Sequence, residues 1–156
     1  MTLRRYIFPL LLAVLIPSCT PARVESESAI STSREYEIAS KQEIYLKDAF
    51  IQEEDRYLVF FHSETCTHCQ QIMGDVVAFA ELNVTKTYFI NTSKKENNVR
   101  RCAAEELIVG VDSIEDLAIV GTPTIIEVED GRTTANVPGK ELCLTFLNEQ
   151  VKTYKK

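Results

Sequence analysis

Two cysteines three residues apart carry the clearest chemistry in this sequence. Cys66 and Cys69 form a Cys-x-x-Cys pair between an apolar run and an apolar-periodic segment. In the first turn of a helix such a pair faces one side and can close a small disulfide loop, and the positive end of the helix stabilises a thiolate on the first cysteine. His68, between them, would add positive charge that favours the Cys66 thiolate and the dithiol form. The pattern predicts a redox site with His68 as its tuning residue.

Two other interpretations of the pair stay open. It could be a permanent disulfide staple, or half of a zinc site. Zinc would need two more ligands, and the remaining candidates in the downstream chain, Cys102 and Cys143, stand alone without a second Cys-x-x-Cys. We therefore expect neither a metal nor a cofactor.

A second signal lies far downstream, where Gly121, Thr122, Pro123 and Thr124 lead into an extended run. Proline at the start of a strand removes a ladder hydrogen bond and is kept where its geometry is needed. A cis bond between Thr122 and Pro123 would expose backbone groups that could pair with an extended substrate. The alternative is a trans proline that ends a loop.

The elements that must position these residues can be predicted from hydrophobic periodicity. Residues 57–62 predict a strand buried on both faces, and the segment after Cys69 predicts a helix. Upstream we expect a short strand at residues 35–39 and a helix from Ser40, with Glu43 completing a capping box, to about residue 52. Downstream we expect strands at 85–91, 124–128 and 133–137, a hairpin turn at 129–132, and helices at 97–109, 112–119 (capped by Asp112) and 140–153.

Together the segment from Phe60 to Cys69 and the run from Gly121 to Thr124 resemble the thioredoxin superfamily, over roughly residues 35–154. The resemblance implies an α/β thioredoxin fold, a central mixed sheet flanked by helices. It implies that Cys66 attacks a substrate disulfide, that Cys69 resolves the mixed disulfide, and that Thr122 and Pro123 cradle the substrate strand. The chain before Pro123 is longer than in a minimal thioredoxin, which predicts an inserted helix.

Three departures from the family pattern concern the site itself. The Cys-x-His-Cys form resembles the disulfide-oxidase branch, and Thr65 replaces a tryptophan of thioredoxins proper. Phe60 stands where the family often buries a carboxylate, and no replacement base is obvious. We interpret Glu64 as a solvated turn residue and His62 as a half-buried histidine with satisfied hydrogen bonds, or alternatively as a second residue that tunes the thiolate.

The two remaining downstream cysteines fall on predicted helical stripes. Cys143 shares a face with Leu142, Phe146 and Leu147, and Cys102 lies in a similar stripe. We interpret both as small buried hydrophobes. A bridge between them would require two helices on the same face of the sheet, whereas we expect them on opposite faces.

The amino terminus has the pattern of an export signal. Arg4 and Arg5 precede an apolar run, and the sequence from Ile16 to Cys19 resembles a bacterial lipobox, with Pro17 as an untypical member. The resemblance implies that residues 1–18 are removed and that Cys19 is lipidated. Residues 19–35 are rich in Ser, Thr and Glu and predict a flexible tether, with a thioredoxin-like domain over residues 36–156.

Composition limits the remaining possibilities. The chain has 156 residues, of which 45% are hydrophobic, and this size suits a single folded domain. Its formal charge of -6 argues against nucleic acid as a binding partner.

The sequence predicts an extracytoplasmic thiol-disulfide oxidoreductase, anchored by lipid to a bacterial cell membrane. Its partners would be protein disulfides or dithiols and a membrane redox partner that recycles the pair. The alternative is a non-catalytic thioredoxin-like lipoprotein that binds a peptide or a soft metal.

Overall fold

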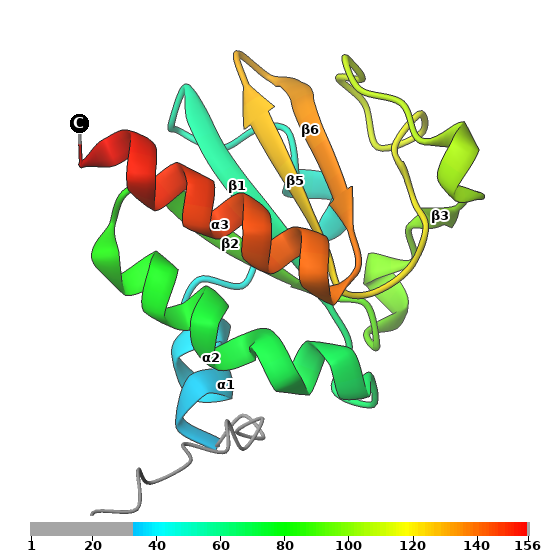
Figure 1. Ribbon diagram of the computed structural model, residues 1–156. Helices are drawn as coiled ribbons and strands as arrows, with labels where there is room; N and C mark the ends of the chain where they lie inside the picture. Colours follow the sequence, from blue (N-terminus) through cyan, green and yellow to red (C-terminus); the bar gives the residue numbers. More distant parts are fainter. Residues whose placement is uncertain (1–32, 156) are drawn as a thin grey trace, which may run out of the picture.

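A four-stranded mixed sheet forms the centre of the computed structural model, which describes residues 33–155 (Figure 1). The strand order is β2 (Lys86–Asn91), β1 (Arg56–His62), β5 (Thr124–Glu129) and β6 (Arg132–Pro138). β1 pairs with β2 in parallel and with β5 antiparallel, and β6 completes an antiparallel hairpin with β5. The predicted mixed sheet flanked by helices is confirmed.

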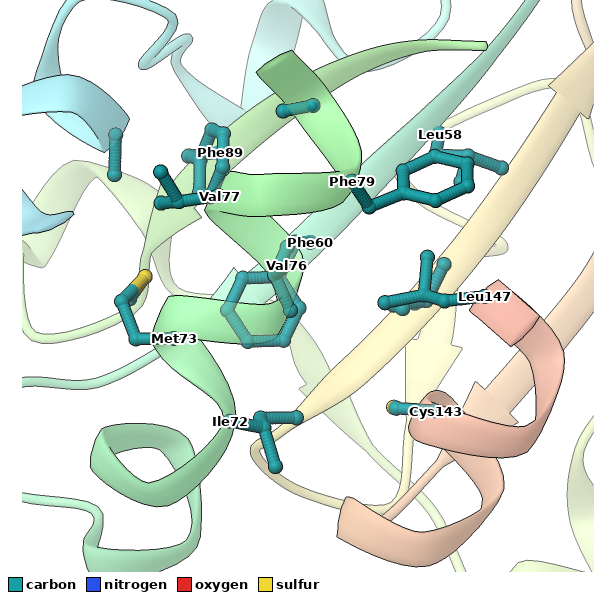
Figure 2. Close-up of a cluster of buried hydrophobic side chains, with 13 residues drawn as sticks. Leu58, Phe60, Ile72, Met73, Val76, Val77, Phe79, Phe89, Cys143 and Leu147 are labelled. Atoms are coloured by element: carbon teal, nitrogen blue, oxygen red, sulfur yellow. The ribbon is translucent and has the colours of Figure 1, made fainter. Parts of the chain in front are cut away.

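Three helices pack on one face of this sheet. They are α1 (Ser33–Ser40), α2 (Thr67–Leu82) and α3 (Lys140–Tyr154), and Figure 1 shows α2 and α3 crossing in front of the strands. Figure 2 shows the apolar cluster beneath them, in which Leu58 and Phe60 of β1 meet side chains of α2 and α3. Because side chains alternate along a strand, His62 points to this same face.

A second apolar cluster covers the opposite face. It contains Tyr57, Val59 and Phe61 of β1 and is closed by Leu46 of the short 3-10 helix η1 (Leu46–Asp48) and by Leu117 and Ile119 of the downstream insertion. Because β1 is buried on both faces, its sequence is an almost continuous run of apolar residues.

The insertion before Pro123 is not helical as predicted at 97–109. It holds two 3-10 turns, η2 (Lys95–Asn97) and η3 (Ala104–Glu106), and a parallel two-stranded ladder of β3 (Arg100–Arg101) with β4 (Ala118–Ile119). Asn97 is fully buried, and its side chain accepts from the Leu46 N–H at 2.9 Å and donates to the Asn91 carbonyl at 3.0 Å. These side-chain bonds anchor Asn97 between η1 and the end of β2, where the sequence predicted the start of a helix.

The predicted helix at 112–119 is also wrong. Ser113, rather than Asp112, organises this segment, because its hydroxyl accepts from the Asp116 N–H and donates to the Asp116 carboxylate. Asp112 pairs with Arg132 instead. The chain then extends into β4, and the insertion runs along β6, where Asn136 donates to the Ala118 carbonyl at 2.9 Å (Figure 1).

Both upstream predictions, the strand at 35–39 and the helix from Ser40 to about residue 52, are wrong. Residues 35–39 belong to α1, which also takes in residues 33–35 of the predicted tether, because Tyr36 and Ala39 at helical spacing pack against the helical face of the core. Ser40 ends this helix, and its hydroxyl donates to the Glu37 carbonyl at 2.7 Å. No capping box forms with Glu43, which pairs with Lys94, and only η1 is helical between Ser40 and residue 52.

Candidate redox site

Cys66 is the residue that begins α2. It is the N-cap, with extended backbone angles (φ −86°, ψ 109°), and it follows a three-residue loop after β1. The Cys66 N–H donates to the Ser63 carbonyl at 3.1 Å, and the Ser63 hydroxyl shares hydrogen bonds with Thr65 and Ser93. The loop therefore fixes the first cysteine at the positive end of the helix.

The sulfur of Cys66 has two hydrogen-bond partners. The Cys69 N–H donates to Cys66 Sγ at 3.2 Å, and the Cys66 thiol donates to the Thr122 carbonyl at 3.3 Å. Cys66 is half-buried, so its sulfur can be reached from solvent. A backbone N–H aimed at the sulfur stabilises a thiolate, as the first turn of a helix does for an N-cap acceptor.

Cys69 lies beneath Cys66 and is fully buried. Burial, followed by its hydrogen bond with Cys66, raises the pKa of the Cys69 thiol to about 12, while the Ser63 backbone and the Thr122 side chain act in the opposite direction. Cys69 is therefore a thiol at neutral pH. The difference in burial between the two sulfurs suits an accessible, half-buried first thiol and a concealed second thiol.

The Thr122–Pro123 loop meets the cysteine pair as the sequence predicts. The peptide bond between Thr122 and Pro123 is cis, which confirms that expectation. The loop is held from both sides, since the Thr124 hydroxyl donates to the Gly121 carbonyl at 2.7 Å and the Gly139 N–H donates to the Pro123 carbonyl at 2.7 Å.

His68 is exposed on the first turn of α2. It lines an open cavity of about 410 Å³ together with residues at the end of β6 and the start of α3, namely Pro138, Gly139, Lys140, Glu141 and Leu142. The structure thus places the predicted tuning residue at the surface, in the segment between the two cysteines.

The interior behind the pair holds polar groups that the sequence did not predict. His62 is only 4% exposed, and its Nδ1 has no hydrogen-bond partner within the described chain, so the expected half-buried, satisfied histidine is wrong. Burial lowers the pKa of His62 to about 4, which makes the imidazole neutral at physiological pH. Tyr36 from α1 lies beside it, and the hydroxyl of Tyr36 is likewise buried and without a partner.

Glu64 is exposed, as the sequence indicates, but its carboxylate is held. Asn91 Nδ2 at the end of β2 donates to Glu64 Oε1 at 2.8 Å, and the Asn91 side-chain oxygen accepts from the Ser93 N–H. This contact ties the loop before Cys66 to the neighbouring strand. Sequence spacing gives no sign of it, because the two residues come from separate elements.

The four cysteines of the described chain are all free. Cys143 is fully buried among apolar side chains, as predicted, and burial raises the pKa of its thiol to about 12. Cys102 is half-buried just after β3, where its N–H donates to the Ile119 carbonyl, and not on a helix as expected. Cys102 and Cys143 form no bridge, and Cys19 lies outside the described residues.

Two features are absent from residues 33–155, the part of the chain that the structure describes. Within them no three His, Cys, Asp or Glu side chains are grouped so that they could hold a metal ion. No helix there combines the length and the apolar character that a membrane crossing requires.

Comparisons with known proteins address the family directly. A model of the thioredoxin-like domain matches residues 46–141. The fold is similar to mitochondrial thioredoxin 3 from Saccharomyces cerevisiae in its oxidized form, with 13% identity and a TM-score of 0.51 over 74% of this chain and 97% of that chain. A thioredoxin from Trypanosoma brucei brucei is similar at 21% identity and a TM-score of 0.48, over 71% and 87% of the two chains. No curated protein sequence matches significantly. Because the family model spans more than half of the chain, the protein belongs to the family of thioredoxin-like domains.

Proposed function

We propose that the protein is an extracytoplasmic, membrane-tethered thiol-disulfide oxidoreductase that exchanges disulfides with protein substrates. The observation that supports this most strongly is the position of Cys66 at the N-cap of α2, with the Cys69 N–H 3.2 Å from its sulfur and the Thr122–Pro123 loop against it. A half-buried thiol in that setting is a nucleophile, and a buried thiol three residues later is its partner.

The exchange balances with these two residues alone. The Cys66 thiolate attacks one sulfur of a substrate disulfide, which forms a mixed disulfide and releases the other substrate sulfur as a thiolate. Cys69 then loses its proton and attacks Cys66 Sγ, so that a Cys66–Cys69 disulfide forms and the substrate leaves with two electrons gained. The reverse sequence oxidises a substrate dithiol. A membrane redox partner would return the pair to its starting state.

The extended substrate segment would lie along the Thr122–Pro123 loop. The Thr122 carbonyl now accepts from the Cys66 thiol, and that donor is lost when Cys66 becomes a thiolate or part of a mixed disulfide. The carbonyl is then free to accept from a backbone N–H of the substrate, next to the reacting sulfur. This supports a peptide, rather than a small compact molecule, as the substrate.

The proposed tether rests on the sequence alone. Lipidation of Cys19 after removal of residues 1–18 would hold the domain at the outer side of the cytoplasmic membrane or in a periplasm. Replacement of Cys19 by Ala should release the protein from the membrane fraction or leave it unprocessed. Finding the unaltered protein in the cytosol with its signal intact would contradict the location.

The exchange activity is tested by turnover of a peptide disulfide. Activity should disappear in Cys66→Ser and should persist in Cys102→Ser, which is a matched control because Cys102 is also half-buried and free. Cys69→Ser should accumulate mixed disulfides with partner proteins, since attack can occur and resolution cannot. Full activity of Cys66→Ser, or a Cys69→Ser variant without reductant-sensitive adducts, would overturn the proposal.

A further inference from the structure

Arg101 carries a positive charge that the described part of the chain leaves unpaired. It lies in β3, in the insertion before the Thr122–Pro123 loop, and its side chain is exposed. Within residues 33–155 its guanidinium makes no ion pair and no hydrogen bond, whereas Arg100 beside it donates from Nη2 to the Asp116 carbonyl at 2.9 Å. The guanidinium of Arg101 therefore keeps all its N–H donors for a ligand.

This guanidinium lies against the loop that precedes β5. Arg101 Nη1 is 3.9 Å from the position that a Cβ atom would take on Gly121, the residue before Thr122. The Gly121 carbonyl accepts from the Thr124 hydroxyl at 2.7 Å, which fixes this end of the loop. Because Gly121 has no side chain, the guanidinium sits directly beside the loop backbone.

The short ladder of β3 with β4 brings Arg101 to this place. Arg101 is the register partner of Ile119, two residues before Gly121, and the Cys102 N–H donates to the Ile119 carbonyl at 3.2 Å. Ile119 is fully buried in the second apolar cluster. The backbone that carries Arg101 is thus held by core packing, although its side chain is exposed.

The same loop contacts the first cysteine of the pair. Gly121 adjoins Thr122, and the Thr122 carbonyl accepts from the Cys66 thiol at 3.3 Å. In an extended substrate segment bound along this loop, the residue next to the reacting cysteine lies about 3.8 Å from it between Cα atoms. A side chain of that neighbouring residue, on the side of Gly121, would come within reach of Arg101.

Glu64 and Lys140, two charged residues that border the site, already have partners. The Glu64 carboxylate accepts from Asn91 at 2.8 Å, and Lys140 pairs with Glu141 at 3.3 Å. The chain as a whole carries a formal charge of -6, which by itself repels an acidic segment. An unpaired cation beside the loop would offset this repulsion locally, so the charge pattern favours a ligand with a carboxylate at this point.

We propose that Arg101 determines substrate specificity by binding a carboxylate one or two residues from the reacting cysteine of an acidic protein segment. This rests on the proposed exchange function. A guanidinium can form two parallel hydrogen bonds with a carboxylate, which fixes the orientation of the segment as well as its charge. Arg101 stays protonated throughout, while Cys66 attacks and Cys69 resolves. A lysine in the same place of the substrate is repelled.

The experiment measures attack by Cys66 on peptide disulfides of different charge. The probes are symmetric disulfides of acetyl-Gly-X-Cys-X-Gly-amide with Glu, Gln or Lys as X, so that charge is present only beside the cysteine. The full chain is used in its dithiol form with Cys102→Ser, because Cys102 is a half-buried thiol next to Arg101. Acid quenching and chromatography of the released peptide give the rate constant, from which the value for Cys66→Ser in the same background is subtracted.

Each variant is judged by the ratio of its rate constants for the Glu and Gln peptides. The same thiolate attacks both peptides, so a change in Cys66 reactivity cancels in this ratio. The ratio should be about fivefold lower in Arg101→Gln, the loss expected for one exposed ion pair. It should be intermediate in Arg101→Lys, which keeps the charge without the planar fork, and Arg101→Glu should favour the Lys peptide.

Arg100→Gln is the matched control. It removes the same charge one residue away, from a side chain that is bonded to Asp116 and not placed at Gly121. The ratio in this variant should stay within about twofold of the unaltered protein. The preference of the unaltered protein for the Glu peptide should also weaken between about 0.05 M and about 0.5 M salt, because the ion pair is exposed.

The outcomes separate the two proposals. An unchanged ratio in Arg101→Gln, or an equal fall in Arg100→Gln, would overturn the role of Arg101 and leave the exchange function intact. If no peptide is attacked in a manner that depends on Cys66, or no Cys66–Cys69 disulfide follows, the exchange function itself fails. Attack on the Gln peptide that persists in each variant shows that its fold is intact.

Discussion

The thiol of Cys66 and the carbonyl oxygen of Thr122 are joined by a hydrogen bond of 3.3 Å, across 56 positions of the chain. The bond links the start of α2 to the loop before β5, so it holds the proposed attacking sulfur beside the loop that would receive a substrate strand. The Thr122 side chain also interacts with the second cysteine. Its hydrogen bond with Cys69 lowers the pKa of that thiol, whereas burial raises it.

Thr122→Val should therefore slow resolution and spare attack. Valine keeps the branched shape and the backbone carbonyl but removes the hydroxyl that stabilises the Cys69 thiolate. A hydrogen bond to a charged group contributes about 1.5–3 kcal/mol, so resolution should be about tenfold slower or more. Rapid-mixing kinetics of the two steps measure this, and Thr122→Ser, which restores the hydroxyl, is the control. Equal slowing of both steps would show that the loop has moved instead.

The buried histidine predicts how stability depends on pH. Unfolded His62 would bind a proton with a pKa of about 6.5, whereas in the folded chain its pKa is about 4. Between these values the unfolded state holds more protons, so the free energy of unfolding falls as pH falls, by up to about 1.4 kcal/mol per pH unit. Urea unfolding at pH 4.5, 5.5 and 6.5 measures the slope.

His62→Phe should flatten this slope without reducing stability at neutral pH, because it replaces an unsatisfied buried nitrogen with an apolar ring. An equally steep loss of stability in that variant would assign the slope to other groups. The imidazole would then be protonated in the folded state too.

Alkylation should distinguish the four cysteines of the described chain. Cys69 and Cys143 are fully buried and have pKa values of about 12, so at about pH 8 only about one in 10,000 of each is a thiolate. Brief treatment of the reduced, folded protein with iodoacetamide should modify Cys66 and Cys102 and spare these two. Mass spectrometry of the fragments gives the result, with urea-unfolded protein as the control. Modification of Cys143 as fast as Cys66 would contradict the burial of α3 against the sheet.

The parts of the site found from sequence are those that depend on local signals. Cys66 and Cys69 are placed by a strand, a turn and a helix that adjoin in sequence, and the Thr122–Pro123 bond lies at the start of a strand. The hairpin turn is predicted for the same reason, since Asp130 and Gly131 both take positive φ (50° and 73°), which Asp-Gly accommodates.

The parts that were missed depend on contacts between distant segments. Tyr36 belongs to a segment predicted as a short strand, and only its packing against the core makes that segment a helix. β3 and β4 are two residues each and exist because they pair with one another, which no local pattern shows. The orphaned atoms of His62 and Tyr36 become visible only when α1 is in place.

His68 should shift the redox balance of the pair. Positive charge on His68, one residue from Cys69 at the start of α2, would stabilise the Cys66 thiolate and hence the dithiol form. His68→Pro should make the pair more reducing, and proline is tolerated there because the first turn of a helix needs no N–H from that residue. His68→Gln separates charge from backbone effects. If neither variant changes the reduction potential, the surroundings of Cys66 set the balance and not the intervening dipeptide.

The reduction potential of the Cys66–Cys69 pair tests the central claim most directly. The full chain would be equilibrated in glutathione buffers, and its disulfide would be identified by mass spectrometry of the fragments. We predict one reversible two-electron couple that joins Cys66 to Cys69, with a potential above that of thioredoxin, about -270 mV. A reversible couple at or below that value would make the protein a reductase. Absence of any Cys66–Cys69 disulfide across the buffers would contradict the redox account as a whole.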